Sequence, residues 1–296
     1  MTDIIVTSGG QVWLDDPHGL RQVPLRIETE SEVRSLAVEL VAAGGRHLDY
    51  ASPIADVRVD PCYRVHAVIP PVAAMGTEIT IRIQRRSPVS VHQFGSAGEP
   101  GASRLRLLQV AVADRENLLI SGPTGSGKTT LVGALLSEVP ASERIIILED
   151  VREIVSAHPH LVRLEVRQAN TDGRGAVTLS DLVRASLRMR PDRIVLGECR
   201  GPEVADLLSA LNTGHAGSMA TVHANSLQDV PSRLTALGQR AGLSPRTVAS
   251  MAVSAISWVA FLSRNQHGRH VSAVGRLRIS ADGVSVEEVD HRRPQR

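Results

Sequence analysis

A glycine-rich stretch at residues 117–130 contains the only lysine of the chain. It reads NLLISGPTGSGKTT, and the spacing Gly122-x4-Gly127-Lys128-Thr129 is that of a phosphate-binding loop. Glycines allow the positive-φ turns that bring backbone N–H groups against phosphate oxygens. Lys128 can reach the β- and γ-phosphates, and the Thr129 hydroxyl can ligate Mg²⁺. The stretch predicts a nucleotide site made of Gly122, Pro123, Thr124, Gly125, Ser126, Gly127, Lys128, Thr129 and Thr130.

The lysine count also narrows the choice of nucleotide. The motif that usually specifies guanine, Asn/Thr-Lys-x-Asp, needs a lysine of its own, and Lys128 already belongs to the loop. Without a second lysine that motif cannot be present. The sequence therefore favours ATP over GTP.

Acidic residues follow two apolar runs that read as buried strands. Residues 145–148 lead into Glu149, and residues 194–197 lead into Glu198. In a parallel sheet, ligands lie beyond the carboxyl ends of the strands, so both acids should face the phosphate loop. One acid can hold the Mg²⁺ shell, directly or through water, while another polarises the attacking water. An isolated acid after a strand is more often a cap, but two beside such a loop favour catalysis.

Two histidines lie at opposite ends of another apolar run. His215 precedes residues 218–222, and His223 follows them. A single histidine is more often structural or solvated, and no cysteine or third histidine lies at metal-ligand spacing. From the residues alone, both are only candidate phosphate sensors.

The elements that position these groups alternate from residue 104 onward. This order predicts an α/β domain, residues 104–296, with a parallel sheet flanked by helices. Strands are expected at 118–121, 144–148, 161–166, 193–197 and 218–222, and helices at 129–139, 179–190, 203–212, 226–241 and 245–254. Further strands should follow at 256–263, 270–279 and 284–289, with antiparallel pairing at the C-terminal end and a hairpin turn at Asp282-Gly283.

Residues 1–86 are predicted to form a separate small α/β domain. A hairpin is expected at residues 4–14, a helix after Ser31, and strands at 55–59, 64–69 and 78–83. Residues 87–103 are rich in Gly, Ser and Pro, which is typical of a linker. No helical apolar pattern is expected there.

Composition excludes several classes of protein. Two cysteines cannot form a disulfide framework or a four-cysteine zinc site, and a reducing cytoplasm is the simplest setting. No signal peptide or membrane span is expected, so any membrane contact should be peripheral and come through a partner. The net charge is only +2 and aromatic residues make up 2% of the chain, which does not favour nucleic-acid binding. Arg292, Arg293 and Arg296 form a basic tail.

Several motifs in one order resemble the ATPases of the type II/type IV secretion superfamily, most of all the CpaF-type ATPases of Tad (Flp) pili. These motifs are the loop at 122–130, Leu-Glu-Asp-Val-Arg-Glu at 148–153, Arg-Leu-Glu-Val-Arg-Gln-Ala-Asn at 163–170, Leu-Arg-Met-Arg-Pro-Asp-Arg at 187–193, Gly-Glu-Cys-Arg-Gly at 197–201 and the histidine-containing run at 212–226. A weaker match covers residues 52–82. The linker is shorter than usual in the family.

The resemblance implies roles for named residues. Glu149 would orient or deprotonate the attacking water, and Glu198 would act through Mg²⁺. His215 and His223 would sense the γ-phosphate. Arg64 and Arg82 would reach the phosphates from the N-terminal domain, whereas Arg200 is as well explained by a surface ion pair.

The resemblance also implies a RecA-like ATPase domain preceded by a small PAS-like α/β domain. Such chains would form a homohexameric motor with ATP and Mg²⁺ as cofactors. Such a motor would lie in the cytoplasm at the inner face of the cytoplasmic membrane, docked on a platform protein of a pilus or secretion system. One alternative is a RecA-like motor of the conjugation type that translocates DNA. Another is a nucleotide-binding scaffold that does not hydrolyse ATP, against which the intact loop and both acids argue.

Overall fold

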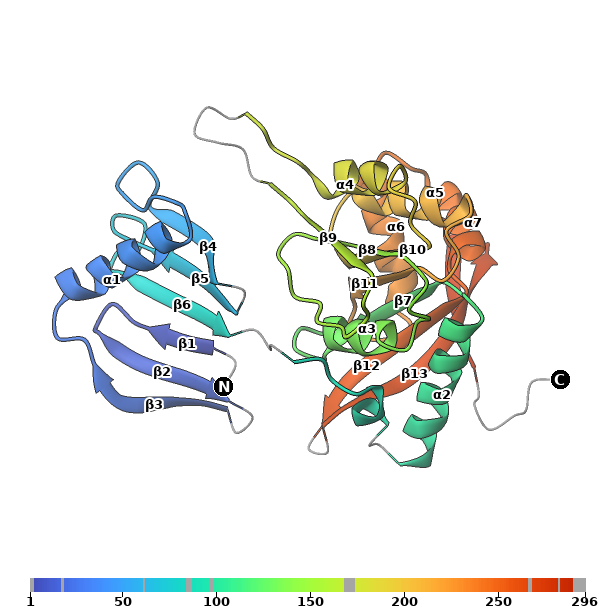
Figure 1. The fold of residues 1–296 in the computed structure, drawn as a ribbon, viewed down its shortest axis with the longest axis horizontal. Helices are drawn as coiled ribbons and strands as arrows, with labels where there is room; N and C mark the ends of the chain where they lie inside the picture. Colours follow the sequence, from blue (N-terminus) through green and yellow to red (C-terminus); the bar gives the residue numbers. More distant parts are fainter. Residues whose placement is uncertain are drawn as a thin grey trace. The chain divides into compact units, whose positions relative to one another are not determined.

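The computed structural model describes residues 3–16, 19–60, 62–83, 87–95, 98–167, 174–265, 268–281 and 283–289 (Figure 1). The chain divides into two compact units, residues 1–86 and 87–296. Asp282 of the expected turn, the basic tail and part of the expected linker lie outside the described residues.

The first unit is one helix on an antiparallel sheet with the strand order β3-β2-β1-β6-β5-β4. The helix, α1 (Glu30–Ala43), begins at a capping box in which Thr29 and Glu32 bond each other's backbone N–H groups. Its buried residues Val33, Ala37 and Val41 recur every fourth position and pack on the sheet. The strands are β1 (Asp3–Val6), β2 (Gln11–Asp16), β3 (Gly19–Arg26), β4 (Ile54–Asp60), β5 (Tyr63–Val68) and β6 (Glu78–Ile83).

The second unit contains a mixed sheet in the order β14-β13-β12-β7-β11-β10-β8-β9. The run from β12 to β9 is parallel, β13 pairs antiparallel with β12, and β14 pairs antiparallel with β13. The predicted parallel sheet with C-terminal antiparallel strands is confirmed. The strands are β7 (Leu118–Gly122), β8 (Ile145–Glu149), β9 (Leu161–Glu165), β10 (Arg193–Cys199), β11 (Met219–His223), β12 (Trp258–Asn265), β13 (Gly268–Ser280) and β14 (Gly283–Glu288).

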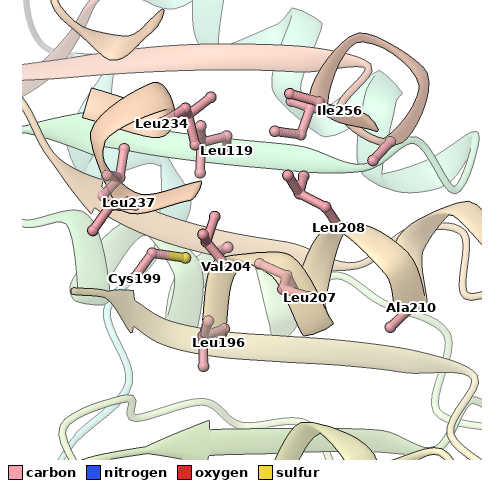
Figure 2. Close-up of a cluster of buried hydrophobic side chains, with 14 of the residues drawn as sticks. Leu119, Leu196, Cys199, Val204, Leu207, Leu208, Ala210, Leu234, Leu237 and Ile256 are labelled. Atoms are coloured by element: carbon pink, nitrogen blue, oxygen red, sulfur yellow. The ribbon is translucent and has the colours of Figure 1, made fainter. Parts of the chain in front are cut away.

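Two apolar clusters cover the two faces of this sheet. One cluster joins Leu119, Ile146 and Leu196 to α4 (Leu179–Ser186), α5 (Glu203–Asn212), α6 (Val230–Arg240) and α7 (Pro245–Ala255). Figure 2 shows part of it, with Val204 and Leu208 of α5 directed at the sheet. The other cluster joins Ile120, Ile147 and Val195 to α2 (Glu99–Ala113) and α3 (Lys128–Leu136). Alternate residues of the central strands therefore serve opposite layers, as the period of two requires.

Part of the segment expected to be a linker is regular structure. Residues Val91–Phe94 form the 3-10 helix η1, and α2 begins at Glu99. Val91 and Phe94 are buried in the same cluster as α3, together with Leu105 and Leu108 of α2. The expectation of no helical pattern in this region was wrong, because α2 starts inside the Gly- and Pro-rich stretch and only its later turns are apolar.

Candidate nucleotide-binding site

The predicted phosphate loop joins β7 to α3 through three glycines with positive φ. Gly122, Gly125 and Gly127 have φ values of 149°, 75° and 96°. A Cβ on Gly122 would lie 2.6 Å from the carbonyl oxygen of Leu262, a distance that real Cβ atoms do not show. Both the backbone conformation and the space therefore require glycine at the start of the loop.

Lys128 is buried within this loop. Its Nζ donates hydrogen bonds to the carbonyl oxygens of Gly122 (2.9 Å) and Pro123 (3.0 Å), and the residue is 8% exposed. Burial lowers the pKa of Lys128 below its usual value, while the negative charges of Glu198 and Glu153 act in the opposite direction. A desolvated ammonium group that is held only by neutral carbonyls is well suited to accept an anion.

The loop also fits phosphate in its other polar groups. The Ser126 side chain is 1% exposed, and its Oγ is one of the few buried side-chain atoms in the described chain without a hydrogen-bond partner. Lys128 and Thr129 begin α3, where the first backbone N–H groups of a helix are free to bind anions. Thr129 is partly buried at that helix start, where its hydroxyl could reach a Mg²⁺ ion held by the phosphates.

The sheet register brings the predicted acids and one histidine to the edge of the loop. Gly122 pairs with His223, and Leu148, just before Glu149, pairs with Leu196 two residues before Glu198. His215 lies before β11, at the opposite edge of the sheet, where its Nδ1 is 3.1 Å from the carbonyl oxygen of Ala210. Within this chain the structure thus groups His223 with the loop and places His215 away from it.

Glu198 forms an ion pair with Arg200. The guanidinium donates through Nε (2.8 Å) and Nη2 (2.6 Å) to Oε2 of Glu198, and its Nη1 lies 3.8 Å from Asp150. The ion pair expected for Arg200 is present. Because the pair is largely exposed, it is weak, and Glu198 can exchange this partner for a metal shell at little cost.

Glu149 is directed into its own loop. It is 3% exposed, and its Oε1 accepts hydrogen bonds from the backbone N–H groups of Glu153 and Ile154, both at 2.8 Å. Its Oε2 lies 3.8 Å from Nη1 of Arg163. Burial raises the pKa of Glu149 to about 7, against the opposing effects of the two N–H groups and Arg163. The role of Glu149 in orienting water therefore stays a prediction.

The sequence analysis did not single out Glu153. This side chain is exposed, and its charge acts on both Lys128 and Arg200, so it lies on the loop's side of the sheet edge. The signal was available, because Glu153 ends the same acidic motif as Glu149. Glu153 is thus a second candidate for the acid that faces the attacking water.

Two residues distant in sequence form a wall beside Gly127. A Cβ on Gly127 would lie 2.7 Å from Cδ of Arg269 and 3.4 Å from a ring carbon of Phe94. Arg269 is on β13, and Phe94 ends η1. No local pattern marks either residue, since only the folded sheet brings them to the loop.

The two arginines predicted from the resemblance belong to the first unit. Arg64 binds Asp56 through two hydrogen bonds of 2.8 and 2.6 Å, and Arg82 donates to Asp3 at 3.2 Å. Arg64 and Arg82 are direct partners on β5 and β6, and Arg58 is the partner of Arg64 on β4. Three arginines thus share one row across the sheet.

The fold and the site define a RecA-like nucleotide-binding domain preceded by a small α/β domain. Residues 1–268 match the family described as "Type II/IV secretion system protein", and the chain belongs to this family. It is 42% identical over 297 residues to a "Putative conjugal transfer protein" of Mycobacterium tuberculosis, covering 98% of this chain and 84% of that protein.

Two further relatives come from type IV secretion systems. The protein PtlH of Bordetella pertussis is 34% identical over 261 residues, covering 79% of this chain and 76% of PtlH. The crystal structure of the VirB11 ATPase from Brucella suis aligns with a TM-score of 0.53 at 25% identity, covering 93% of this chain and 92% of VirB11. The predicted superfamily and fold class are confirmed; the CpaF-type subgroup stays a prediction.

Proposed function

We propose that the chain hydrolyses ATP with Mg²⁺ and works as a homohexameric motor of a pilus or secretion system. The observation that carries the proposal is the buried Lys128 ammonium in a loop with three positive-φ glycines. This loop lies at the edge of the sheet where β8 ends at Glu149 and β10 ends just after Glu198. ATP and protein export also agree with family membership. Tad pilus assembly is the narrower form of the proposal.

Each group at the edge has a separate task in this proposal. Lys128 and the backbone N–H groups of the loop bind the phosphates, while Thr129 and Glu198 would hold Mg²⁺, in part through water. When bound, Mg²⁺ neutralises charge on the β- and γ-phosphates. Glu149 or Glu153 orients the attacking water, and His223 senses the terminal phosphate. His215 is proposed for the same task, and Arg64 and Arg82 contribute from the first unit.

The partner proposed is an inner-membrane platform protein, which would place the motor at the cytoplasmic face of that membrane. None of the helices in the described ranges combines the length and the apolar character needed to cross a bilayer. Contact with the membrane is therefore assigned to the partner in this proposal.

The decisive experiment measures phosphate release from ATP by the purified chain. We expect hydrolysis that depends on Mg²⁺, is not stimulated by double-stranded DNA, and accompanies a hexamer in light scattering. Strong stimulation by DNA would favour the DNA-translocating alternative instead. Binding of ATP without turnover would favour the scaffold.

Paired substitutions can separate the roles of the two acids. We expect Glu153→Gln to lower kcat by about 10²-fold or more and Glu149→Gln by less, because Glu153 is exposed, whereas Glu149 is buried and its carboxylate is held by the N–H groups of its own loop. Steady-state kinetics at saturating ATP would measure both. The reverse order would assign water orientation to Glu149, as the resemblance implies.

Glu149→Gln should also change the pH dependence of stability. An acid whose pKa rises on folding stabilises the native state below its unfolded pKa, and this contribution is lost as pH rises to the folded value of about 7. The free energy of unfolding of the variant, relative to the unmodified chain, should therefore increase between pH 5 and pH 8. Urea unfolding at both pH values would measure it, and a constant difference would contradict the burial of an ionisable Glu149.

A further inference from the structure

A three-point contact fixes the loop that follows β8. Glu149 receives the N–H groups of Glu153 and Ile154, and Nη1 of Arg163 donates to the carbonyl oxygen of Ile154 at 2.6 Å. The same Nη1 lies 3.8 Å from Glu149 Oε2. Arg163 therefore contacts both the loop and the carboxylate that holds the loop.

The register explains why an arginine stands at this position. Ile147 of β8 pairs with Arg163 of β9, and Glu149 pairs with Glu165. Residues two apart on neighbouring strands share one face, so Arg163 lies beside two carboxylates of like charge. Both carboxylates stabilise its charge, while burial and Arg152 oppose it and lower the pKa of Arg163.

The other side of the loop lies against α3. A Cβ on Gly133 would lie 2.2 Å from the carbonyl oxygen of Val155, so helix and loop meet backbone to backbone. The hydroxyl of Ser137, directly after α3, forms a hydrogen bond of 3.0 Å with the hydroxyl of Ser156, in which either group can be the donor. It also accepts a hydrogen bond of 3.0 Å from the backbone N–H of Ala157. The loop is thus held between the helix that begins at Lys128 and the Arg163–Glu149 pair.

We propose that Arg163 is a positioning residue for the acidic loop at residues 150–155, and that it sets where Asp150 and Glu153 lie relative to the nucleotide. This inference rests on the proposed ATPase function. Arg163 acts through Glu149 and the Ile154 carbonyl and touches no phosphate. Its loss should leave nucleotide affinity intact and affect the rate of hydrolysis.

The test compares Arg163→Gln with Arg163→Lys and with the control Arg184→Gln. Arg184 is also an ion-paired arginine of this unit, but it is 62% exposed and binds Asp206 on α5. For Arg163→Gln we expect kcat to fall by about 10- to 100-fold with the Kd for ATP changed less than about twofold. Arg163→Lys, which keeps the charge, should recover part of the loss, and Arg184→Gln should match the unmodified chain.

A pH profile distinguishes positioning from simple loss of packing. Among the described residues, the charged groups that act on Glu149 are Arg163 on β9 and Glu153 in its own loop, and Gly197 of β10 lies against its side chain. Removal of Arg163 leaves Glu149 harder to ionise, and a protonated Glu149 holds the loop less firmly, so the acid limb of kcat should move to higher pH. Arg163→Lys should keep the limb near its original position. An equal loss of kcat at every pH would overturn the proposal.

Amide hydrogen exchange tests the contact independently of catalysis. The amides of Glu153 and Ile154 should exchange faster in Arg163→Gln than in Arg184→Gln, with the same thermal unfolding midpoint in both. Unchanged exchange and unchanged kcat would overturn the proposal. If the unmodified chain does not hydrolyse ATP, the proposed function fails, whereas the exchange result still decides whether Arg163 holds the loop. Should Arg163→Gln not fold, the same two measurements on Arg163→Lys decide.

Discussion

Lys128→Ala is expected to lower kcat/KM for ATP by about 10³-fold or more and to weaken binding of ATP and ADP. The Nζ atom contacts two loop carbonyls, and Lys128 is the only lysine of the sequence. A preorganised cation aimed at developing charge in a water-poor site is worth several kcal/mol, about 10²–10³ in rate for a single neutral donor. Isothermal titration for binding and phosphate release for turnover would measure the two losses.

The control for this variant is Lys128→Arg. A planar guanidinium keeps the charge but is larger and cannot occupy the narrow position between the carbonyls of Gly122 and Pro123. We expect Lys128→Arg to lose nearly as much activity, which would show that position as well as charge matters. Lys128→Ala should unfold at the temperature of the unmodified chain or above, because removing a desolvated charge relieves a cost. Intact affinity for ATP in Lys128→Ala would contradict the site.

The sequence was sufficient for the centre of the site because its signals are local. The loop spacing, the strand that precedes it and the helix that follows it lie within residues 117–139, and β7 and α3 form there. The register also brings the ends of β8 and β10 to the edge of the loop, since parallel strands share one carboxyl edge, while the catalytic roles of Glu149 and Glu198 stay predictions.

The sequence did not predict the elements whose apolar residues do not recur at a regular spacing. Strand β3 is an edge strand with mostly exposed residues and a proline at position 24, so it has neither alternation nor a buried face. Helix α2 starts at Glu99 with Pro100 in its first turn, where a proline is tolerated and reads as a linker signal. In both cases sheet pairing or packing outweighs local propensity.

Side-chain direction at the site could not be predicted from strand order. Glu149 ends β8 beside the phosphate loop, but residues 150–155 fold back and supply two N–H groups that hold its carboxylate. Phe94 and Arg269 reach Gly127 only through η1 and β13, on segments distant in sequence. Contacts of this kind depend on the completed fold.

Deletion of the first unit, residues 1–86, should also lower ATP turnover strongly. We expect residues 87–296 alone to bind ATP as the full chain does and to hydrolyse it about 10³- to 10⁵-fold more slowly, the range for an arginine that stabilises the transition state. The second unit has its own two apolar clusters, and the first has a separate one, so each can keep its core. Single-turnover hydrolysis by the fragment would measure the loss.

Point variants can assign the loss to the arginine row rather than to the missing unit. Arg64 and Arg82 are adjacent on β5 and β6, and their ion pairs with Asp56 and Asp3 are partly exposed. An exposed pair such as Arg82–Asp3 contributes about 0–1 kcal/mol, so a phosphate can replace that carboxylate readily, whereas replacing the carboxylate of the two-bond Arg64–Asp56 pair costs more. We expect Arg64→Ala and Arg82→Ala each to lower kcat by more than about 10²-fold, with the control Arg21→Ala on β3 unaffected.

Mixing each variant with Lys128→Ala chains would show whether the arginines serve their own chain or a neighbour, because recovered turnover requires exchange between subunits. A fragment as active as the full chain, or active Arg64→Ala and Arg82→Ala variants, would contradict a role for the first unit in catalysis.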